Sequence, residues 1–244
     1  DVDAVFCPCL TQNFDEGDAD NHFNCPVVAY YAELLRGNMP ELTDENFLYP
    51  HLIICDEKGL AAELGKALSK RFGRISAREM RAAVKKGMAD YQAYMAGVRQ
   101  KGEEALLWAR AHKKRIMVLA GRPYHIDAEI GHGIDQLATS LGFAVVSEDS
   151  VCHLGRTPEV HVLNQWTYHA RLYRAAAFVA TQPDMEFVQL VSFGCGVDAI
   201  TTDEARAILE RAGKYYTQIK IDEIANLGAV KIRLRSLLGA LEMK

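Results

Sequence analysis

The sequence has little of what marks membrane, secreted or nucleic-acid-binding proteins. No apolar run approaches the roughly 20 residues that cross a bilayer, and the N-terminus has no signal-peptide pattern. Lysine and arginine together number 28 against 32 acidic residues, so the net charge of −4 offers no basic face to nucleic acid or to an anionic membrane. We therefore expect a cytoplasmic protein that binds neither nucleic acid nor a membrane.

Further absences narrow the class of activity. The sequence has no Gly-x4-Gly-Lys-Ser/Thr loop and no glycine-rich phosphate motif of the actin-like fold, so ATP hydrolysis is not predicted for these 244 residues. It also has no repeat of fixed period and no low-complexity tract. The chain starts at Asp1 without a methionine and reaches the strand-like pair Val5-Phe6 almost at once. We therefore expect a piece of a larger protein.

The pattern of apolar residues predicts an α/β fold with parallel sheets. Apolar residues at spacings of three and four predict a long or broken helix from 78 to 112 that links two halves. Before it, Pro26 marks a helix start and 51–55 suits a buried strand. We predict two Rossmann-like or flavodoxin-like domains. Their bounds are 1–76 for an N-terminal α/β part, 77–112 for the linking helix and 113–244 for a C-terminal Rossmann-like domain.

Strands and helices alternate in the C-terminal half, which predicts a parallel sheet covered on both faces. The expected strands are 116–120, 143–147, 178–181, 189–193 and 216–221, and the expected helices are 130–141, 162–177, 203–212 and 227–241. The start of the third helix rests on Thr201 and Glu204, which have the spacing of a capping box. Because ligands gather outside the carboxyl ends of parallel strands, the loops that follow the strands should hold the chemistry.

The six cysteines are better explained by metal binding or free thiols than by disulfides, given a reducing compartment. Cys9 follows a strand-like segment, Cys25 precedes a helix, and Cys195 lies between Gly194 and Gly196 before a helix. Helix N-termini favour thiolates, and the two glycines would let the backbone approach an inorganic cluster. Structural zinc usually has paired Cys-x2-Cys spacings, which these residues lack. Spacing alone leaves an iron–sulfur site, a zinc site and free thiols open.

Four short motifs carry a family resemblance. They are Phe-Cys-Pro-Cys at 6–9, Asp-Asn-His-Phe-Asn-Cys-Pro at 20–26, Gly-Arg-Pro-Tyr-His at 121–125 and Ser-Phe-Gly-Cys-Gly-Val-Asp at 192–198. Over nearly the whole chain the sequence resembles the 2-hydroxyacyl-CoA dehydratase superfamily, in particular its large CoA-substrate-specific enzyme activases. The resemblance implies a [4Fe-4S] cluster, or a double-cubane [8Fe-9S] cluster, at a domain interface. Carried over to this chain, its ligands are Cys9, Cys25 and Cys195, with Cys7 a weaker fourth candidate.

The same resemblance implies a redox role. Dehydratases of the superfamily receive an electron from an ATP-hydrolysing activator and place it on an acyl-CoA thioester, which eases loss of the hydroxyl group. We expect such an activator in cis or in trans, a CoA-thioester substrate, and a dimer or a larger chain. Those dehydratases have two different subunits, so two alternatives stay open: a non-catalytic electron-transfer or docking module, and a binding protein with incidental thiols. Whether the chain is itself a reductase or dehydratase is left undecided.

Polar residues after the expected strands are the remaining candidates. Arg122, His125 and His132 follow the strand 116–120 and could bind a CoA phosphate, donate a proton or hydrogen-bond a cluster. The alternative is a charged loop that pairs with its own acids, Asp127 and Glu129. The pair Glu148-Asp149 after the next strand is interpreted as a cap or solvated loop, and His153, His161 and His169 as structural or surface residues.

Overall fold

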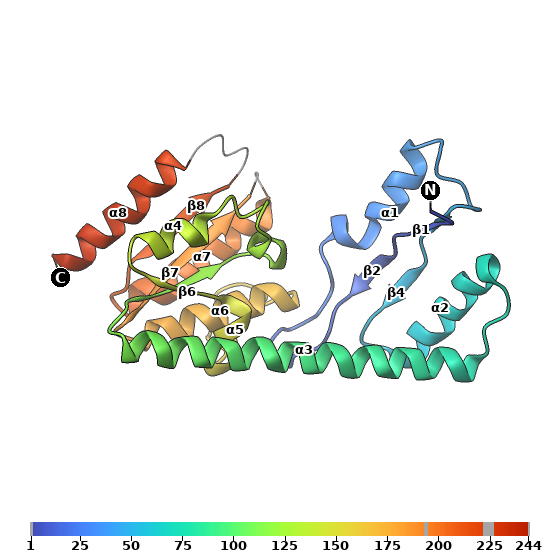
Figure 1. The fold of residues 1–244 in the computed structure, drawn as a ribbon, viewed down its shortest axis with the longest axis horizontal. Helices are drawn as coiled ribbons and strands as arrows, with labels where there is room; N and C mark the ends of the chain where they lie inside the picture. The colour runs from blue at the N-terminus through green and yellow to red at the C-terminus, as the bar shows by residue number, and fades with distance from the viewer. Residues whose placement is uncertain (1, 193–194, 222–226, 244) are drawn as a thin grey trace. The chain divides into compact units, whose positions relative to one another are not determined.

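The computed structural model describes residues 2–192, 195–221 and 227–243 (Figure 1). It confirms a mixed α/β fold with parallel sheets. The chain divides into two compact units, one of residues 1–95 and 164–167 and the other of residues 96–163 and 168–244. The sequence-based bounds at 76 and 112 stay a prediction. Within the described ranges, no helix is both long and apolar enough to cross a membrane.

The first unit is built on two short parallel ladders. Strand β1 (Val5–Phe6) pairs with β3 (Phe47–Leu48), and β2 (Cys9–Gln12) pairs with β4 (His51–Ile53). Helix α1 (Pro26–Asn38) packs on β2, and α2 (Glu57–Phe72) packs on β4. Helix α1 begins at Pro26, which confirms the predicted helix start. Proline suits this position because the first residue of a helix needs no hydrogen-bond partner for its nitrogen.

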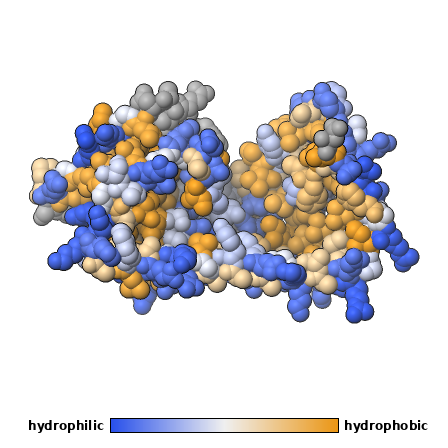
Figure 2. All heavy atoms as spheres, viewed as in Figure 1, coloured by the Kyte–Doolittle hydropathy of each residue, from blue (hydrophilic) through white to orange (hydrophobic). Residues whose placement is uncertain are grey.

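Helix α1 turns small side chains inward. Its buried residues are Ala29 and Ala32, whose single methyl groups let the helix backbone approach β2 closely. Five of its larger apolar residues are exposed, and Figure 2 shows hydrophobic side chains gathered over this part of the unit. They are Val27, Val28, Tyr30, Tyr31 and Leu34. Helix α1 therefore lies close to the sheet, and Cys9 at the start of β2 and His51 at the start of β4 lie near its Glu33 side chain.

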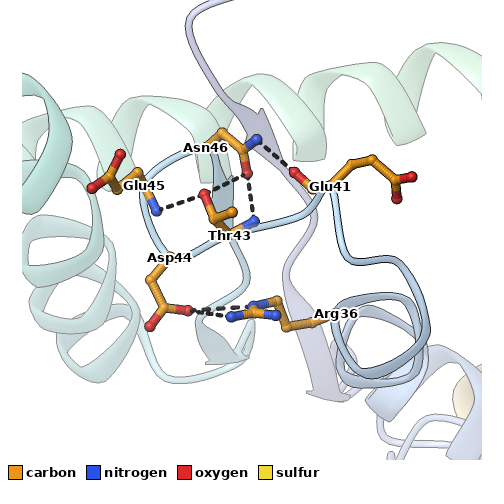
Figure 3. Close-up of polar contacts among 6 residues, drawn as sticks. All are labelled: Arg36, Glu41, Thr43, Asp44, Glu45 and Asn46. Atoms are coloured by element: carbon orange, nitrogen blue, oxygen red, sulfur yellow. Dashed lines mark hydrogen bonds and ion pairs between the residues drawn. The ribbon is translucent and has the colours of Figure 1, made fainter.

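The loop between α1 and β3 is held by its own polar groups (Figure 3). The Asn46 Oδ1 atom accepts from the backbone N–H of Thr43 at 2.7 Å, and its Nδ2 donates to the carbonyl of Glu41 at 2.9 Å. The guanidinium of Arg36, in the last turns of α1, donates to the carboxylate of Asp44 at 3.3 Å. These contacts fix the C-terminal end of α1 against the start of β3.

The second unit holds a four-stranded parallel sheet of order β6-β5-β7-β8. Its strands are β5 (Ile116–Ala120), β6 (Ala144–Ser147), β7 (Met185–Val191) and β8 (Tyr216–Lys220). The helices after α2 are α3 (Ala77–Ala111), α4 (Ile134–Ser140), α5 (Glu148–Val151), α6 (Thr167–Ala180), α7 (Gly196–Arg211) and α8 (Gly228–Glu242). Two short 3-10 turns, η1 (Pro123–Ile126) and η2 (Cys152–Leu154), complete the elements.

Both faces of this sheet are covered, as the apolar strands predict. Along β5, Ile116, Val118 and Ala120 join one apolar cluster, and Met117 and Leu119 join the other. The first cluster includes residues of α6 and α7, and the second includes residues of α4 and α8. A strand buried on both sides reads as a continuous apolar run, which is why β5 was predicted within its observed bounds.

Two expectations about this unit were wrong. The expected strand 178–181 is the end of α6, because Phe178 and Val179 pack into the sheet from a helix, and a short apolar run does not distinguish the two. The helix expected to start near 203 begins at Gly196. Its Thr201 hydroxyl donates to the carbonyl of Val197 inside the helix and caps nothing. The earlier start puts Cys195 at the N-cap position of α7, where its side chain makes no capping hydrogen bond.

Candidate functional site

The strand order of the second unit creates a place for ligands at one edge of the sheet. The chain runs from β5 outward to β6, and then returns to the other side of β5 to form β7. The loops that follow β5 and β7 therefore leave neighbouring strands in different directions. In open α/β sheets, ligands bind at such a switch point, outside the carboxyl ends of the strands.

Arg122 and Cys195 meet at this switch point. An Nη2 atom of Arg122 lies 3.3 Å from the Cys195 Sγ atom and donates to an Asp198 carboxylate oxygen at 2.7 Å. The Arg122 and Asp198 side chains are 17% and 12% exposed. Burial alone would lower the pKa of Arg122, but the charge and the hydrogen bond of the facing Asp198 outweigh it. The pKa of Arg122 is therefore raised, and the guanidinium stays positive. A fixed positive charge facing the sulfur suits a negatively charged sulfur ligand.

His125 is buried in the same loop as a neutral donor. Its Nδ1 atom accepts the backbone N–H of Arg122 at 3.0 Å, so the ring proton is on Nε2. Burial first, and then the charge of Arg122, lower the pKa of His125 to about 4. The Nε2 atom has no hydrogen-bond partner within the described ranges. Gly121 makes room for the ring, because a Cβ at position 121 would collide with the imidazole.

The state of His125 can be measured directly. We expect its imidazole to stay neutral, with the proton on Nε2, from pH 8 down to about pH 5, whereas an ordinary histidine titrates near pH 6.5. Nitrogen-15 NMR of the imidazole rings reports both the charge and the tautomer. The exposed His112, directly after α3, provides the comparison in the same spectra. Titration of His125 alongside an ordinary exposed histidine would contradict the buried geometry.

Two further titratable side chains are buried beside this loop. Burial and the neighbouring Asp149 raise the pKa of Glu148, directly after β6, to about 8, although Arg171 and the backbone N–H of Gly121 oppose the shift. Burial and the charge of Arg122 lower the pKa of His169 in α6 to about 4. Sequence reasoning placed both among caps and surface residues, because nothing local signals their burial. Buried groups with shifted pKa values gather at functional sites more often than elsewhere.

A cavity of ≈ 210 Å³ lies at the carboxyl ends of β5 and β6. Its apolar lining comes from Leu119, Val145, Val146 and Ile126, and its polar lining from His125, Asp127, Asp135 and Ser147. The volume is below that of most sites for whole cofactors, so the cavity suits part of a larger molecule.

The other loop residues behave differently from Arg122 and His125. His132 is exposed with a φ of 50°, and its backbone N–H donates to the carbonyl of Glu129 at 3.3 Å. A catalytic role for His132 stays a prediction. The alternative was a charged loop that pairs with its own acids. Arg122 does not fit it, because its partner is Asp198 of α7. In the described contacts, Asp127 accepts only from backbone N–H groups.

The predicted cluster ligands are divided between the units. Cys25 is the partly exposed N-cap residue of α1, and Cys195 is the N-cap residue of α7 in the other unit. Cys9 is fully buried beside Ala32 and Phe47, and this burial raises the pKa of the Cys9 thiol. Cys7 is partly buried against the same cluster. The set of three cysteines at an interface therefore stays a prediction.

The two glycines beside Cys195 were predicted to approach a cofactor. Gly194 lies outside the described residues. Gly196 is the exposed first residue of α7, and a Cβ added there would meet no atom within 4 Å. Packing against the described residues therefore does not require a glycine at 196, and the space around it is open.

The donor chemistry fits a thiolate-held iron–sulfur cluster at two of the three cysteines. Cys25 and Cys195 are both partly accessible at helix starts, where backbone N–H groups can donate to sulfur. Cys9 has mixed neighbours: one ligand atom each from Cys9, Glu33 and His51 lie within 4.8 Å of one another. Oxygen and nitrogen donors around one thiol are unlike the all-cysteine sets that hold most clusters.

Comparison with known families assigns the first three-fifths of the chain to a family. Residues 1–151 match the sequence model of a family described as the CoA enzyme activase uncharacterised domain. No curated protein and no solved structure matches the chain. The matched residues include Cys9, Cys25, Arg122 and His125, and they end before Cys195.

Proposed function

Since the chain belongs to the family of the CoA enzyme activase uncharacterised domain, we propose that it is an iron–sulfur redox module for the reaction of an acyl-CoA. In this proposal it receives low-potential electrons from an ATP-hydrolysing activator, and a CoA thioester is reduced or dehydrated. The observation that carries the proposal is the contact of Arg122 with Cys195 at the switch point of the sheet.

A bound cluster would supply one-electron transfer at low potential. Cys25 and Cys195 are the two proposed ligands whose surroundings fit it best, and Cys9 is the third residue of the predicted set. Arg122 holds the Cys195 side chain and places a positive charge beside it, while Asp198 fixes the guanidinium. Each of these contacts would exist before the cofactor binds, so the site needs little rearrangement to accept it.

The neighbouring groups suit a thioester substrate. His125 is a neutral donor whose Nε2–H has no acceptor in the described structure, and a thioester carbonyl oxygen is such an acceptor. Glu148 keeps its proton at neutral pH, so it is available as a proton donor. The cavity lined by His125 would take the acyl group rather than the whole CoA molecule, because of its size.

Cofactor content tests this proposal. We expect anaerobically reconstituted wild-type protein to contain iron and acid-labile sulfide and to give an EPR signal after reduction. The Cys195→Ala and Cys25→Ala variants should each lose most of the iron and the signal, because each lacks a proposed ligand. Cys55→Ala is the matched control, since Cys55 is exposed and contacts Gln12 rather than the proposed site. Unchanged iron in Cys195→Ala would remove that residue from the site.

A further inference from the structure

Three different metal-ligand side chains converge on one point of the first unit. Cys9 begins β2 and His51 begins β4, and the two residues are direct partners across the parallel ladder. Glu33 comes from α1, which packs on β2. The three elements can be followed in Figure 1. A Glu33 carboxylate oxygen lies 2.9 Å from His51 Nε2, and one ligand atom of each residue lies within 4.8 Å of the other two.

We propose that Cys9, Glu33 and His51 bind a single divalent cation of the zinc class. Sulfur, nitrogen and oxygen donors together are typical of zinc and cobalt sites, whereas magnesium and calcium prefer oxygen alone. Around one tetrahedral zinc ion these atoms would be separated by about 3.3–3.6 Å, given the usual bond lengths. The Glu33 oxygen and His51 Nε2, at 2.9 Å, would therefore move slightly apart on binding, and any distance to the Cys9 sulfur near the 4.8 Å limit would shorten into that range.

One of the three residues is buried and two are half-exposed, which suits a metal site. Cys9 is fully buried against Ala32 and Phe47, which fix the position of its sulfur. The Glu33 and His51 side chains are 47% and 49% exposed, so both can rotate toward an ion and the ion has a path from solvent. A fixed ligand at the base with adjustable ligands above it allows closure without moving the strands.

The site would have three protein ligands and an open fourth position. The half-exposed Glu33 and His51 side chains leave solvent access for a water molecule beside the ion. Three protein ligands with one water are the arrangement of catalytic zinc, while structural zinc usually has four protein ligands. One thiolate and one carboxylate would neutralise the charge of a divalent ion, which favours its retention.

This site shares one residue, Cys9, with the ligand set predicted for the cluster. A Cys9 thiolate bound to a zinc-class ion is not available as a cluster ligand, so the two roles of Cys9 exclude each other. Glu33 and His51 take part only in the new site. Their variants therefore distinguish failure of this proposal from failure of the cluster proposal.

Cobalt is a direct probe, because Co²⁺ bound to a thiolate has a charge-transfer absorption band that free cobalt lacks. We expect the chelator-treated full chain to develop this band on titration with Co²⁺ alone, and Zn²⁺ to displace it. Cys9→Ala should abolish the band. Glu33→Gln and His51→Asn should each weaken cobalt binding by about tenfold or more, since each removes one of three ligands. Cys7→Ser and Cys55→Ser are matched cysteine controls and should keep the band.

The exposed variants keep the test decisive if Cys9→Ala fails to fold, because Glu33 and His51 lie at the surface. A band of unchanged affinity in Glu33→Gln and His51→Asn would overturn the proposal, and so would absence of the band in wild type. A third outcome would assign Cys9 to the cluster instead. In that case wild type would not bind cobalt, Cys9→Ala would lose iron and sulfide, and Glu33→Gln and His51→Asn would keep both.

Discussion

The Arg122→Ala variant is expected to lower the free energy of unfolding by about 3 kcal/mol or more, because it leaves the Asp198 carboxylate buried without its counter-charge. The second Asp198 carboxylate oxygen has no partner in the part of the chain that the structure describes, so Arg122 is the charge that compensates this group. Urea denaturation at neutral pH, followed by circular dichroism, measures the change.

Arg110 provides a matched control in the same unit. It also pairs with an aspartate, Asp184, at 2.8 Å, but the two side chains are 40% and 32% exposed. Solvent screens such a pair, so Arg110→Ala should cost no more than about 1 kcal/mol. The double variant Arg122→Ala/Asp198→Ala should recover part of the lost stability, because the unpaired charge is gone. An Arg122→Ala effect no larger than that of Arg110→Ala would show that the pair at the switch point is solvated.

Glu148 is expected to make the protein less stable as pH rises. Its pKa in the folded chain is about 8, above the ordinary value of 4.5, so between these values the folded state holds a proton that the unfolded state has lost. The stabilisation is fully present below about pH 4.5 and is lost as pH rises through 8. Within this window the loss approaches about 1.4 kcal/mol for each pH unit. Above pH 8, Glu148→Gln should be more stable than wild type.

The difference between wild type and Glu148→Gln isolates this group. His125 and His169 titrate in both proteins, so their contributions cancel, and Asp149 and Arg171 face position 148 in both. Unfolding curves at several pH values should therefore differ by a slope that Glu129→Gln, at an exposed position, does not change. A pH-independent difference between wild type and Glu148→Gln would mean that the Glu148 carboxyl is ionised in the folded chain.

Structural features that depend on residues close together in the chain could be predicted from the sequence. The apolar run of β5 and the proline after Cys25 both act locally, and both predictions match the structure. The end of α6 was misread as a strand because Phe178 and Val179 are apolar in either form. Thr201 misled for a similar reason, since a hydroxyl bonds as well inside a helix as at its start.

The candidate site depends on contacts between distant residues, which periodicity does not contain. Arg122 and Cys195 could each be chosen from the sequence as residues of loops after strands. Their contact depends on β5 and β7 being neighbours, and only the strand order decides that. The burial of Glu148 and the grouping of Cys9 with Glu33 and His51 depend equally on tertiary packing.

The adjacency of β5 and β7 also has a kinetic consequence. Strand β5 ends at residue 120 and β7 begins at residue 185, so the central pair of the sheet closes a long loop that contains β6 and α6. Closing such a loop costs chain entropy before the paired strands repay it, so parallel pairings of this kind form late in folding. Arg122 and Cys195 become neighbours only after that step. Loading of the cofactor proposed for Cys195 would therefore require a completed sheet, and a nascent chain that already carries every cysteine would not yet present the contact between Arg122 and Cys195.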